Sequence, residues 1–330
     1  MRAAVLAAPR QIHLVDTWPE PVCGAGDVIV AVTAVATCGT DLAYVHGSRD
    51  IVEGGLVVGH EAIGVVVAVG ADVDASRIGG RVAIEPNYPC TTCRPCLNAL
   101  PSLCTSRRSP VVTEQGFLAE RVAVPADFAW PLPEEVSDED AVCIEPLAVA
   151  LSAVRRAGDF SARERIAIAG AGSIGRILVD ALHRRGITPA IFDLSGERVQ
   201  AAVALGARPV EPGERFDLMF ETTGSGAGAA AALELVDPDG LFMAIGVGET
   251  PIPVDTKVLV RRGLTITGSM IYDHPHDYAA VIDTVARGEA RPGAVLHAPF
   301  SFEDAQEALV GAAGRVGKTW IRVSSGDWDA

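Results

Sequence analysis

Four cysteines follow one another at the spacing x2, x2, x7. They are Cys90, Cys93, Cys96 and Cys104, four of the seven cysteines in the chain. Four thiolates at this spacing can complete a tetrahedron around one Zn²⁺, which leaves no position for water and makes the site structural. Disulfides are the alternative, but they need an oxidising compartment, and nothing in the sequence suggests export. The spacing therefore predicts a structural-zinc lobe at residues 90–104.

A glycine-rich segment is expected to follow a strand and to open a helix. In Gly170-Ala-Gly172-Ser-Ile-Gly175 the first glycine permits a tight turn, and the second lets the backbone approach a pyrophosphate. The third permits close packing of helix and strand, and the helix N-terminus favours the phosphate charge. The motif predicts a dinucleotide site. Its candidate cofactor-binding residues are Gly170, Gly172, Ser173, Ile174 and Gly175.

Asp193 ends the next predicted strand, 18 residues after Gly175. A carboxylate at this point can accept hydrogen bonds from both hydroxyls of the adenine ribose, and it would repel a 2′-phosphate, so it favours NAD over NADP. Asp193 could instead cap a helix. Arg198 could reach the adenine side of the cofactor, or it could be a solvated helix residue.

Three further segments carry residue types that bind metals. Cys38, His60 and Glu145 offer one thiolate, one imidazole and one carboxylate, a set that leaves the fourth position of Zn²⁺ open, as in catalytic sites. A metal held in this way acts as a Lewis acid toward an alcohol oxygen and lowers its pKa. Thr40 follows Cys38 by two residues, and its hydroxyl could pass the alcohol's proton outward.

Each of these residues also has an ordinary explanation. Cys38 could be a small buried apolar group, His60 a core histidine with satisfied hydrogen bonds, and Glu145 a helix cap. Their joint presence beside a four-cysteine lobe and a dinucleotide motif favours a catalytic metal.

The elements that must position these residues change in character along the chain. Up to about residue 147, short β-branched runs bounded by Gly, Asp and Pro predict an antiparallel, barrel-like β domain. After Glu145-Pro146 a helix is expected over 147–156, and strands then alternate with helices, which predicts a doubly wound parallel sheet. The strands are expected at 165–170, 189–193, 216–221 and 241–246, and the helices at 173–185, 196–205 and 227–235.

Near residue 268 the alternation fades. Helices are expected over 277–287 and 302–310, and a closing strand over 319–323. We expect this tail to return to the first domain.

Composition excludes some classes of function. The chain has 330 residues, 49% of them hydrophobic, and a formal net charge of −15. An acidic balance argues against a nucleic-acid partner, because phosphate binding needs Lys and Arg patches. The start of the chain is predicted to be a strand and not a signal peptide, and no run approaches the ~18 apolar residues of a membrane span. We expect a soluble, cytoplasmic protein.

With these motifs in this order, the chain resembles the zinc-dependent medium-chain dehydrogenase/reductase family of the alcohol dehydrogenase superfamily. Within that family it is most similar to the sorbitol, threonine, glucose and 2,3-butanediol dehydrogenase branch, and the resemblance covers nearly the whole chain. The matching stretches are CGTDLAY (38–44), VVGHEAIGVVVAVG (57–70), GRVAIEP (80–86), the four-cysteine lobe, IEPLAVA (144–150), AGAGSIG (169–175) and FDLSGERVQAAVALGA (192–207).

The resemblance implies an α/β protein with a GroES-like β domain and a Rossmann doubly wound parallel sheet. It implies a GroES-like catalytic domain at 1–147, a Rossmann NAD-binding domain at 148–270, and a C-terminal segment at 271–330 that returns to the catalytic domain. It also implies two zinc ions per chain, one catalytic and one structural.

The family motifs also assign roles to single residues. Cys38 and His60 resemble zinc ligands, and Glu61 and Glu145 resemble two carboxylates that alternate between direct and indirect contact with zinc. Thr40 resembles the proton-relay hydroxyl. By position, nicotinamide contacts are expected from Thr223 and Val247, and substrate contacts from Tyr44 and Tyr272.

Some positions depart from the family pattern. Ala43 stands where many relatives carry a relay histidine, and His46 or solvent could replace it. Ala99 stands where the lobe usually has glycine, so the loop could bend differently. Cys143 is expected in the core, on a strand that points it inward together with Glu145, and it is the one candidate for an alternative ligand.

The leading hypothesis is an NAD- and zinc-dependent oxidoreductase that moves hydride from a secondary alcohol of a polyol, sugar, cyclitol or amino-sugar to NAD, giving a ketone. Neutral or cationic substrates are favoured over phosphorylated ones because of the acidic charge and the two tyrosines. A vicinal-diol (2,3-butanediol-type) or threonine-type dehydrogenase is an alternative. A non-catalytic zinc- and dinucleotide-binding sensor and a zinc-free reductase belong to other classes. We also expect a homo-oligomer, a dimer or a tetramer.

Overall fold

The computed structural model describes residues 1–159, 163–252 and 254–323. Its internal contacts divide the chain into two compact units. The first contains residues 1–145 together with the described residues from Leu296 onward, and the second contains Pro146–Val295. No helix in the described ranges combines the length and the apolar character that crossing a bilayer requires.

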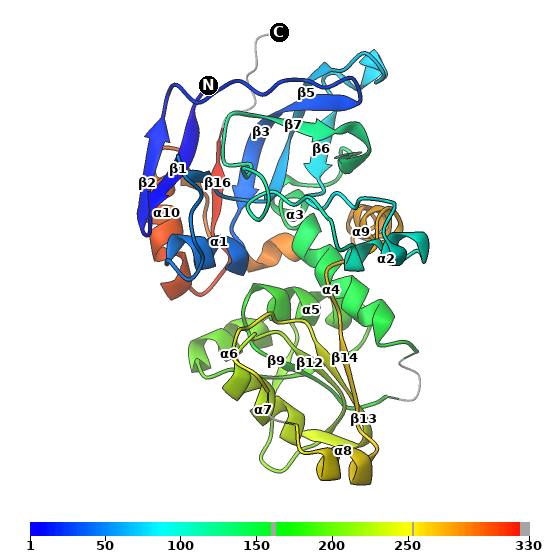
Figure 1. The fold of residues 1–330 in the computed structure, drawn as a ribbon. Helices are drawn as coiled ribbons and strands as arrows, with labels where there is room; N and C mark the ends of the chain where they lie inside the picture. Colours follow the sequence, from blue (N-terminus) through cyan, green and yellow to red (C-terminus); the bar gives the residue numbers. More distant parts are fainter. Residues whose placement is uncertain (160–162, 253, 324–330) are drawn as a thin grey trace. The chain divides into compact units, whose positions relative to one another are not determined.

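The main sheet of the first unit has seven strands and is antiparallel except for one short pair (Figure 1). β-branched and small residues fill its long central strands, which suits a pleated sheet that is buried on its inner face. The order is β15-β16-β3-β5-β6-β8, and β7 also pairs with β3. The strands are β3 (Asp27–Ala36), β5 (Glu61–Val69), β6 (Arg81–Ile84), β7 (Arg121–Pro125), β8 (Ala129–Pro131), β15 (Phe300–Ser301) and β16 (Trp320–Arg322).

Within the described residues, a small antiparallel sheet and four helices complete the first unit. The small sheet has the order β2-β1-β4 and consists of β1 (Ala3–Ala8), β2 (Gln11–Val15) and β4 (Leu56–Val57). The helices are α1 (Gly39–Val45), α2 (Arg94–Leu97), α3 (Asp138–Ala141) and α10 (Ala305–Gly311). Short 3₁₀ turns in the chain cover Ala75–Arg77, Pro101–Leu103, Ala126–Phe128, Pro292–Val295 and Ala312–Gly314.

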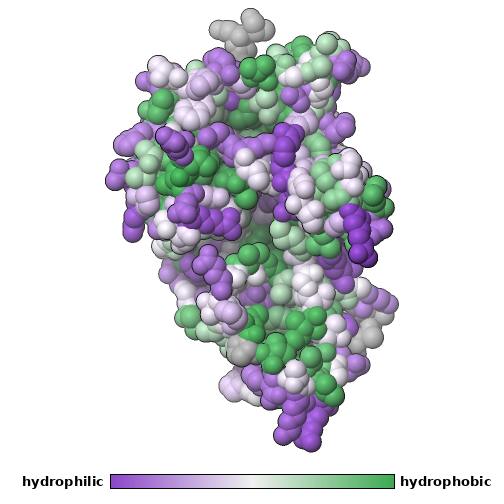
Figure 2. Space-filling model, viewed as in Figure 1, coloured by the Kyte–Doolittle hydropathy of each residue, from purple (hydrophilic) through white to green (hydrophobic). Residues whose placement is uncertain are grey.

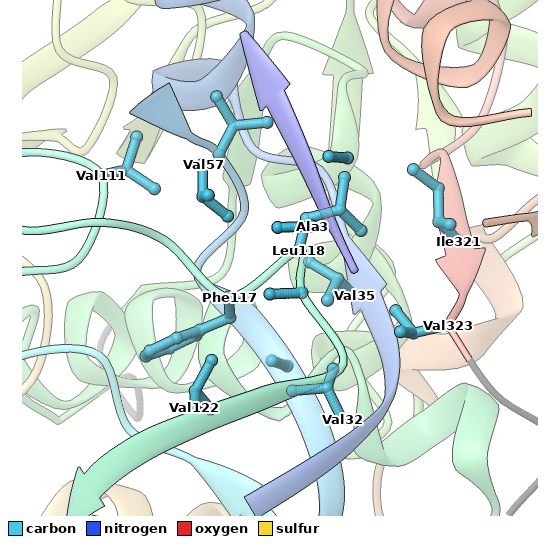
Figure 3. Close-up of a cluster of buried hydrophobic side chains, with 14 of the residues drawn as sticks. Ala3, Val32, Val35, Val57, Val111, Phe117, Leu118, Val122, Ile321 and Val323 are labelled. Atoms are coloured by element: carbon cyan, nitrogen blue, oxygen red, sulfur yellow. The ribbon is translucent and has the colours of Figure 1, made fainter. Parts of the chain in front are cut away.

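The core of the first unit joins residues from both ends of the chain. Figure 3 shows Val32 and Val35 of β3 near Ile321 of β16 and Phe117 of a connecting loop. Ile321 pairs with Val35 across an antiparallel ladder, so the strand predicted at 319–323 closes against the centre of this sheet. Strand β3, near the start of the chain, therefore depends on strand β16, near its end, for part of its burial.

The second unit is built on a six-stranded parallel sheet. Its order is β11-β10-β9-β12-β13-β14, so the strand order reverses between β9 and β12, as in doubly wound dinucleotide-binding folds. The strands are β9 (Ile166–Ala169), β10 (Ala190–Phe192), β11 (Arg208–Pro209), β12 (Phe216–Glu221), β13 (Val236–Ala244) and β14 (Thr265–Gly268).

The helices of this unit are α4 (Ile144–Arg156), α5 (Ser173–His183), α6 (Gly196–Val203), α7 (Gly226–Glu234), α8 (Thr256–Arg262) and α9 (His276–Ala286). Of these, α5, α6, α7 and α8 lie between successive strands and contact the sheet, whereas α4 precedes its first strand and α9 follows its last. Phe216, Met219 and Phe242 lie in a core of small and aromatic residues between strands and helices. The α/β fold class expected from the sequence is confirmed.

Two predictions about the boundary segments need correction. The tail was expected to return to the first domain from residue 271, but residues up to Val295 contact the second unit. Arg155 of α4 binds Asp273 and Asp277 at 2.8 and 2.7 Å, and these ion pairs hold the segment there. The predicted strand through Cys143 and Glu145 is also wrong, because α4 already begins at Ile144.

One edge strand of the parallel sheet is β14, and β11 lies at the other edge. Apolar side chains gather on the surface over β13, β14 and α8 (Figure 2), where Val254, Val260 and Ile266 are exposed. An edge strand with apolar neighbours is a surface on which a second chain can associate.

Candidate functional site

The four cysteines of the lobe converge on one point. Their sulfur atoms all lie within 4.8 Å of one another. Cys93 Sγ is 3.4 Å from Cys96 Sγ and 3.8 Å from Cys104 Sγ, so these pairs are not disulfides, whose S–S bond measures ~2.05 Å. Zn–S bonds of ~2.3 Å in a tetrahedron place the sulfurs ~3.8 Å apart. The arrangement fits a zinc ion with four thiolate ligands.

Backbone N–H groups point at these sulfurs. The N–H of Cys93 donates to Cys90 Sγ at 3.3 Å, and the N–H of Cys90 donates to Cys104 Sγ at 3.2 Å. Donation from the backbone of Cys96 and of Thr105 lowers the pKa of Cys93 to about 6. Such donors stabilise thiolate, which is the form that binds metal.

The loop keeps a left-handed turn without its usual glycine. Ala99 has a φ of 57°, a conformation that disfavours a residue with a Cβ. A strained residue persists where its surroundings determine its conformation, and here it follows the short helix α2 that carries Cys96.

A second group of possible ligands forms at one end of the main sheet. Cys38, His60 and Glu61 place one ligand atom each within 4.8 Å of the others. Cys38 follows β3 and is the N-cap of α1, while His60 precedes β5 and Glu61 begins it. Because Ala36 of β3 pairs with Glu61, the two strands bring these segments together.

Asp41 organises this group. Its side chain is fully buried and accepts hydrogen bonds from the N–H of Cys38 (2.8 Å) and the N–H of Gly59 (2.9 Å). Asp41 Oδ1 also lies 3.2 Å from His60 Nδ1. When Nδ1 donates to a carboxylate, Nε2 is the nitrogen that can bind a metal.

The local electrostatics favour a cation at this point. Burial alone would lower the pKa of His60, but the Asp41 carboxylate outweighs it, with a further contribution from Cys38, and raises that pKa well above its ordinary value. Thiolate, imidazole and carboxylate are also ligand types that Zn²⁺ takes in proteins. The donor set therefore fits a zinc ion.

Glu61 is paired with a lysine from the far end of the chain. Lys318 Nζ donates to Glu61 Oε1 at 2.8 Å and to the carbonyl of Thr37 at 2.7 Å, and it lies 2.5 Å from Glu61 Oε2. Both side chains are 1% exposed. Burial disfavours the ammonium, but the Glu61 carboxylate outweighs this effect and raises the pKa of Lys318.

Three other residues singled out from the sequence, Thr40, Glu145 and Cys143, lie outside this three-residue group. Thr40 lies on the first turn of α1, two residues from Cys38. Glu145 is buried in the first turn of α4 and is not part of the three-residue group. Cys143 is fully buried, and burial raises the pKa of its thiol, which agrees with the predicted core role.

The two predicted substrate tyrosines are both buried. Tyr44 is 8% exposed, packs in the core of the first unit and has the Arg49 guanidinium over its ring at 5.6 Å. Tyr272 is 2% exposed, and its ring lies 5.5 Å from that of Tyr278. This burial favours packing roles over the predicted substrate contacts.

The glycine-rich loop of the second unit connects β9 to α5. Gly170 has a φ of 97°, and a Cβ at Gly175 would lie 1.9 Å from the carbonyl oxygen of Gly170. A Cβ at Gly172 would meet nothing within 4 Å, and Gly172 is the N-cap of α5 without a side-chain cap. The start of α5 therefore lacks a side-chain cap and has open space beside Gly172, which fits a pyrophosphate.

Asp193 lies after β10 and against this loop. Its Oδ2 accepts from the N–H of Ala171 at 2.8 Å, and its Oδ1 accepts from the N–H of Ser195 at 2.9 Å. Ser195 caps α6, which disposes of the helix-cap explanation for Asp193, and Arg198 lies in the first turn of that helix. The carboxylate is held at the carboxyl end of β10, where the adenine ribose binds in doubly wound folds.

Two further predicted cofactor contacts lie on neighbouring turns. Thr223 follows β12 and Val247 follows β13, and both are exposed at the carboxyl ends of their strands. The buried Glu221 carboxylate accepts hydrogen bonds from the N–H and the hydroxyl of Thr223. The two turns also touch, because a Cβ at Gly248 would lie 1.7 Å from the Gly224 carbonyl oxygen.

Two residues that contact this ligand group, Asp41 and Lys318, were not predicted from the sequence. Asp41 carried a signal, since an acidic residue three positions after a helix N-cap commonly bonds back to the cap. Lys318 carried none, because its partner Glu61 is 257 residues away.

Two family models match the chain. Residues 24–134 match the alcohol dehydrogenase GroES-like domain, and residues 173–287 match the zinc-binding dehydrogenase domain. The first range lies within the first unit and the second range within the second unit.

Full-length relatives agree with these models. The chain is 29% identical to sorbitol dehydrogenase of Bacillus subtilis (94% of this chain, 92% of the relative) and 28% identical to starvation-sensing protein RspB of Escherichia coli (94% of each).

Solved structures show the same fold. A short chain alcohol dehydrogenase of E. coli complexed with NADH has a TM-score of 0.89 at 25% identity, covering 98% of this chain and 99% of its own. A zinc-binding dehydrogenase of Sinorhizobium meliloti bound to NADP has a TM-score of 0.87 at 26% identity, with the same coverage. Motifs, family models and fold agree, and the chain belongs to the zinc-dependent medium-chain dehydrogenase family, in its polyol branch.

Proposed function

We propose that this protein is an NAD- and zinc-dependent dehydrogenase that oxidises a secondary alcohol of a neutral or cationic polyhydroxylated compound to a ketone. The observation that carries the proposal is the convergence of Cys38, His60 and Glu61, with their ligand atoms within 4.8 Å of one another, in a chain that also holds a dinucleotide loop. Neither a sensor nor a zinc-free reductase needs this group.

Cys38, His60 and Glu61 would hold the catalytic zinc, with Glu145 as the alternate carboxylate. When bound, zinc supplies Lewis acidity that lowers the pKa of the substrate alcohol. Asp41 orients His60 through Nδ1, and Lys318 offsets the charge of Glu61. Thr40, on the first turn after Cys38, would take the alcohol's proton.

The cofactor we propose is NAD, held by the loop 170–175 and by Asp193. The position of the Asp193 carboxylate at the end of β10 supports this choice, as does a relative of known structure with NADH. Arg198 is proposed for the adenine side, and Thr223 and Val247 for the nicotinamide side.

A polyol, sugar, cyclitol or amino-sugar is the proposed substrate class. Sorbitol dehydrogenase is among the curated relatives, and the chain carries a net charge of −15. An acidic protein attracts ammonium groups and repels phosphate. A vicinal diol or a threonine-type substrate is the alternative.

A non-catalytic sensor is the second candidate, because one relative is named a starvation-sensing protein. Zinc content separates the two proposals. An enzyme of this kind holds about two zinc ions per chain, one at each cysteine-containing group, whereas a sensor that keeps only the closed four-cysteine site holds about one.

We further propose a cytoplasmic homo-oligomer, a dimer or a tetramer. Thiolate ligands need a reducing compartment. The open edge of β14 and its exposed apolar neighbours support association with a second copy.

Cys93→Ser removes one thiolate from the four-cysteine lobe and leaves three ligands. We expect loss of one zinc per chain and a lower Tm, with the other zinc retained, measured by metal analysis and thermal unfolding. Cys23→Ser is the matched control, because Cys23 is a partly buried cysteine outside both groups. Unchanged zinc content and unchanged Tm in Cys93→Ser would contradict the four-thiolate site.

Cys38→Ser and His60→Ala each remove a ligand of the proposed catalytic zinc. Turnover should fall by ~10³-fold or more, since the metal supplies several kcal/mol of transition-state stabilisation. NADH binding, followed by fluorescence titration, should persist because the dinucleotide loop lies in the other unit. His13→Ala, at an exposed histidine, serves as the control. Normal kcat in Cys38→Ser or His60→Ala refutes this assignment.

Asp193→Ala removes the carboxylate proposed to hold the ribose hydroxyls. The KM for NAD should rise by about tenfold or more, as expected for loss of a hydrogen bond to a charged group of ~1.5–3 kcal/mol, and use of NADP should gain relative to NAD. Glu197→Ala, an exposed acid on the first turn of α6, should change neither. A wild-type enzyme that already prefers NADP would disprove the proposed role of Asp193.

A further inference from the structure

A buried carboxylate lies at the point where the strand order of the parallel sheet reverses. Glu221 is the last residue of β12 and is 1% exposed. The reversal lies between β9 and β12, and in doubly wound folds ligands bind outside the carboxyl ends of the strands at this point. Among the described residues, no lysine, arginine or histidine forms an ion pair with Glu221. A carboxylate is costly to bury without a counter-ion, so a glutamate at this position needs an explanation.

One oxygen of this carboxylate binds Thr223. Glu221 Oε1 accepts a hydrogen bond from the N–H of Thr223 at 2.7 Å and a second one from its hydroxyl. An ionised carboxylate only accepts hydrogen bonds, whereas the amide of a glutamine offers an acceptor and a donor of nearly the same shape. A glutamate therefore fixes the direction of the bond, and the hydroxyl of Thr223 gives its proton to Glu221.

The hydroxyl of Thr223 has one bonding position left. A hydroxyl carries one proton and two acceptor positions. The proton goes to Glu221, and one acceptor position receives the N–H of Ser225 at 3.0 Å. Thr223 is exposed just beyond the end of β12. A molecule bound at this strand end therefore meets a hydroxyl that accepts a hydrogen bond and has no proton to donate.

The backbone of Glu221 holds the neighbouring turn. Its carbonyl oxygen accepts from the N–H of Ile245 at 2.8 Å and from the N–H of Gly246 at 2.9 Å. A Cβ at Gly246 would lie 2.2 Å from the backbone nitrogen of Gly224 and 3.0 Å from Glu221 Oε2, so this close approach requires glycine. The turn after β12 and the turn after β13, which carries Val247, are thus fixed against each other around Glu221.

A fixed acceptor discriminates between the polar groups of a dinucleotide. A ribose hydroxyl both donates and accepts, so it can adapt to either kind of partner. An amide N–H₂ group only donates, and it therefore needs an acceptor. Nicotinamide carries such a group on its carboxamide, and Thr223 and Val247 are the residues proposed above for the nicotinamide side.

We propose that Glu221 is a positioning residue that holds the Thr223 hydroxyl as an acceptor for the carboxamide N–H₂ of nicotinamide. The inference rests on the proposed dinucleotide function and deepens it. Glu221 acts on the cofactor through Thr223, because its side chain is almost fully excluded from solvent and its Oε1 is occupied by that residue. The charge-assisted bond to Glu221 also polarises the hydroxyl, which makes its oxygen a better acceptor.

Cofactor binding to the full-length protein, measured by calorimetry without alcohol, tests the proposal. The probes are NAD and its 3-acetylpyridine analogue, in which a methyl group replaces the carboxamide N–H₂. Thr223→Val should raise the Kd for NAD by ~3- to 10-fold, as expected for one hydrogen bond, and should leave the Kd for the analogue unchanged. Thr223→Ser keeps the hydroxyl and should bind NAD as wild type does.

A double-mutant cycle tests whether Glu221 acts through Thr223. Glu221→Ala should weaken NAD binding about as much as Thr223→Val, and its addition to Thr223→Val should cause little further loss. Glu221→Gln should recover most of the affinity, because its amide oxygen can still accept both bonds. Glu234→Ala, at an exposed acid of α7, should leave binding unchanged. If Glu221→Ala does not fold, Thr223→Val with the two probes decides the matter.

The results separate this positioning role from the proposed function. Additive losses from Glu221→Ala and Thr223→Val overturn the role, because Glu221 would then act on the turn itself. Equal weakening of NAD and the acetylpyridine analogue by Thr223→Val also overturns it, since the hydroxyl would not bind the carboxamide N–H₂. Failure of wild type to bind NAD would instead contradict the proposed function.

Discussion

A buried ion pair between Lys318 and Glu61 links the two ends of the first unit. Both side chains are almost fully excluded from solvent, so neither charge is tolerable without the other. Lys318 reaches Glu61 only because β16 pairs with β3, next to the strand that Glu61 begins. The same ammonium donates to the carbonyl of Thr37, immediately before Cys38. The metal-ligand group therefore depends on chain closure by a segment outside every motif that carries its ligands.

Local motifs could be predicted from the sequence because their chemistry depends on spacing alone. The four cysteines and the loop Gly170–Gly175 are each contiguous, and the structure brings each set into a compact arrangement. The doubly wound sheet could likewise be predicted, since strands and helices alternate with short connections. Cys38 and His60 could be proposed as ligands from their residue types, but Glu61 needed the family resemblance, and the register that pairs the strands beside them is revealed by no local pattern.

Tertiary contacts explain what the sequence did not predict. Residues 271–295 were assigned to the returning tail, but the ion pairs of Arg155 with Asp273 and Asp277 keep them in the second unit. Tyr272 was expected to contact substrate by its position in a motif, and its burial against Tyr278 could be seen only in three dimensions.

The central claim is that one chain combines an open zinc site with a dinucleotide site for alcohol oxidation. The most direct test adds NAD and a panel of polyols, sugars, cyclitols and amino-sugars to zinc-replete protein and follows NADH by absorbance, with sugar phosphates and amino acids included for comparison. The account predicts NADH formation with the highest kcat/KM for a neutral or cationic polyhydroxylated compound. No NADH from any alcohol, in protein that holds two zinc ions per chain and binds NAD, would contradict it.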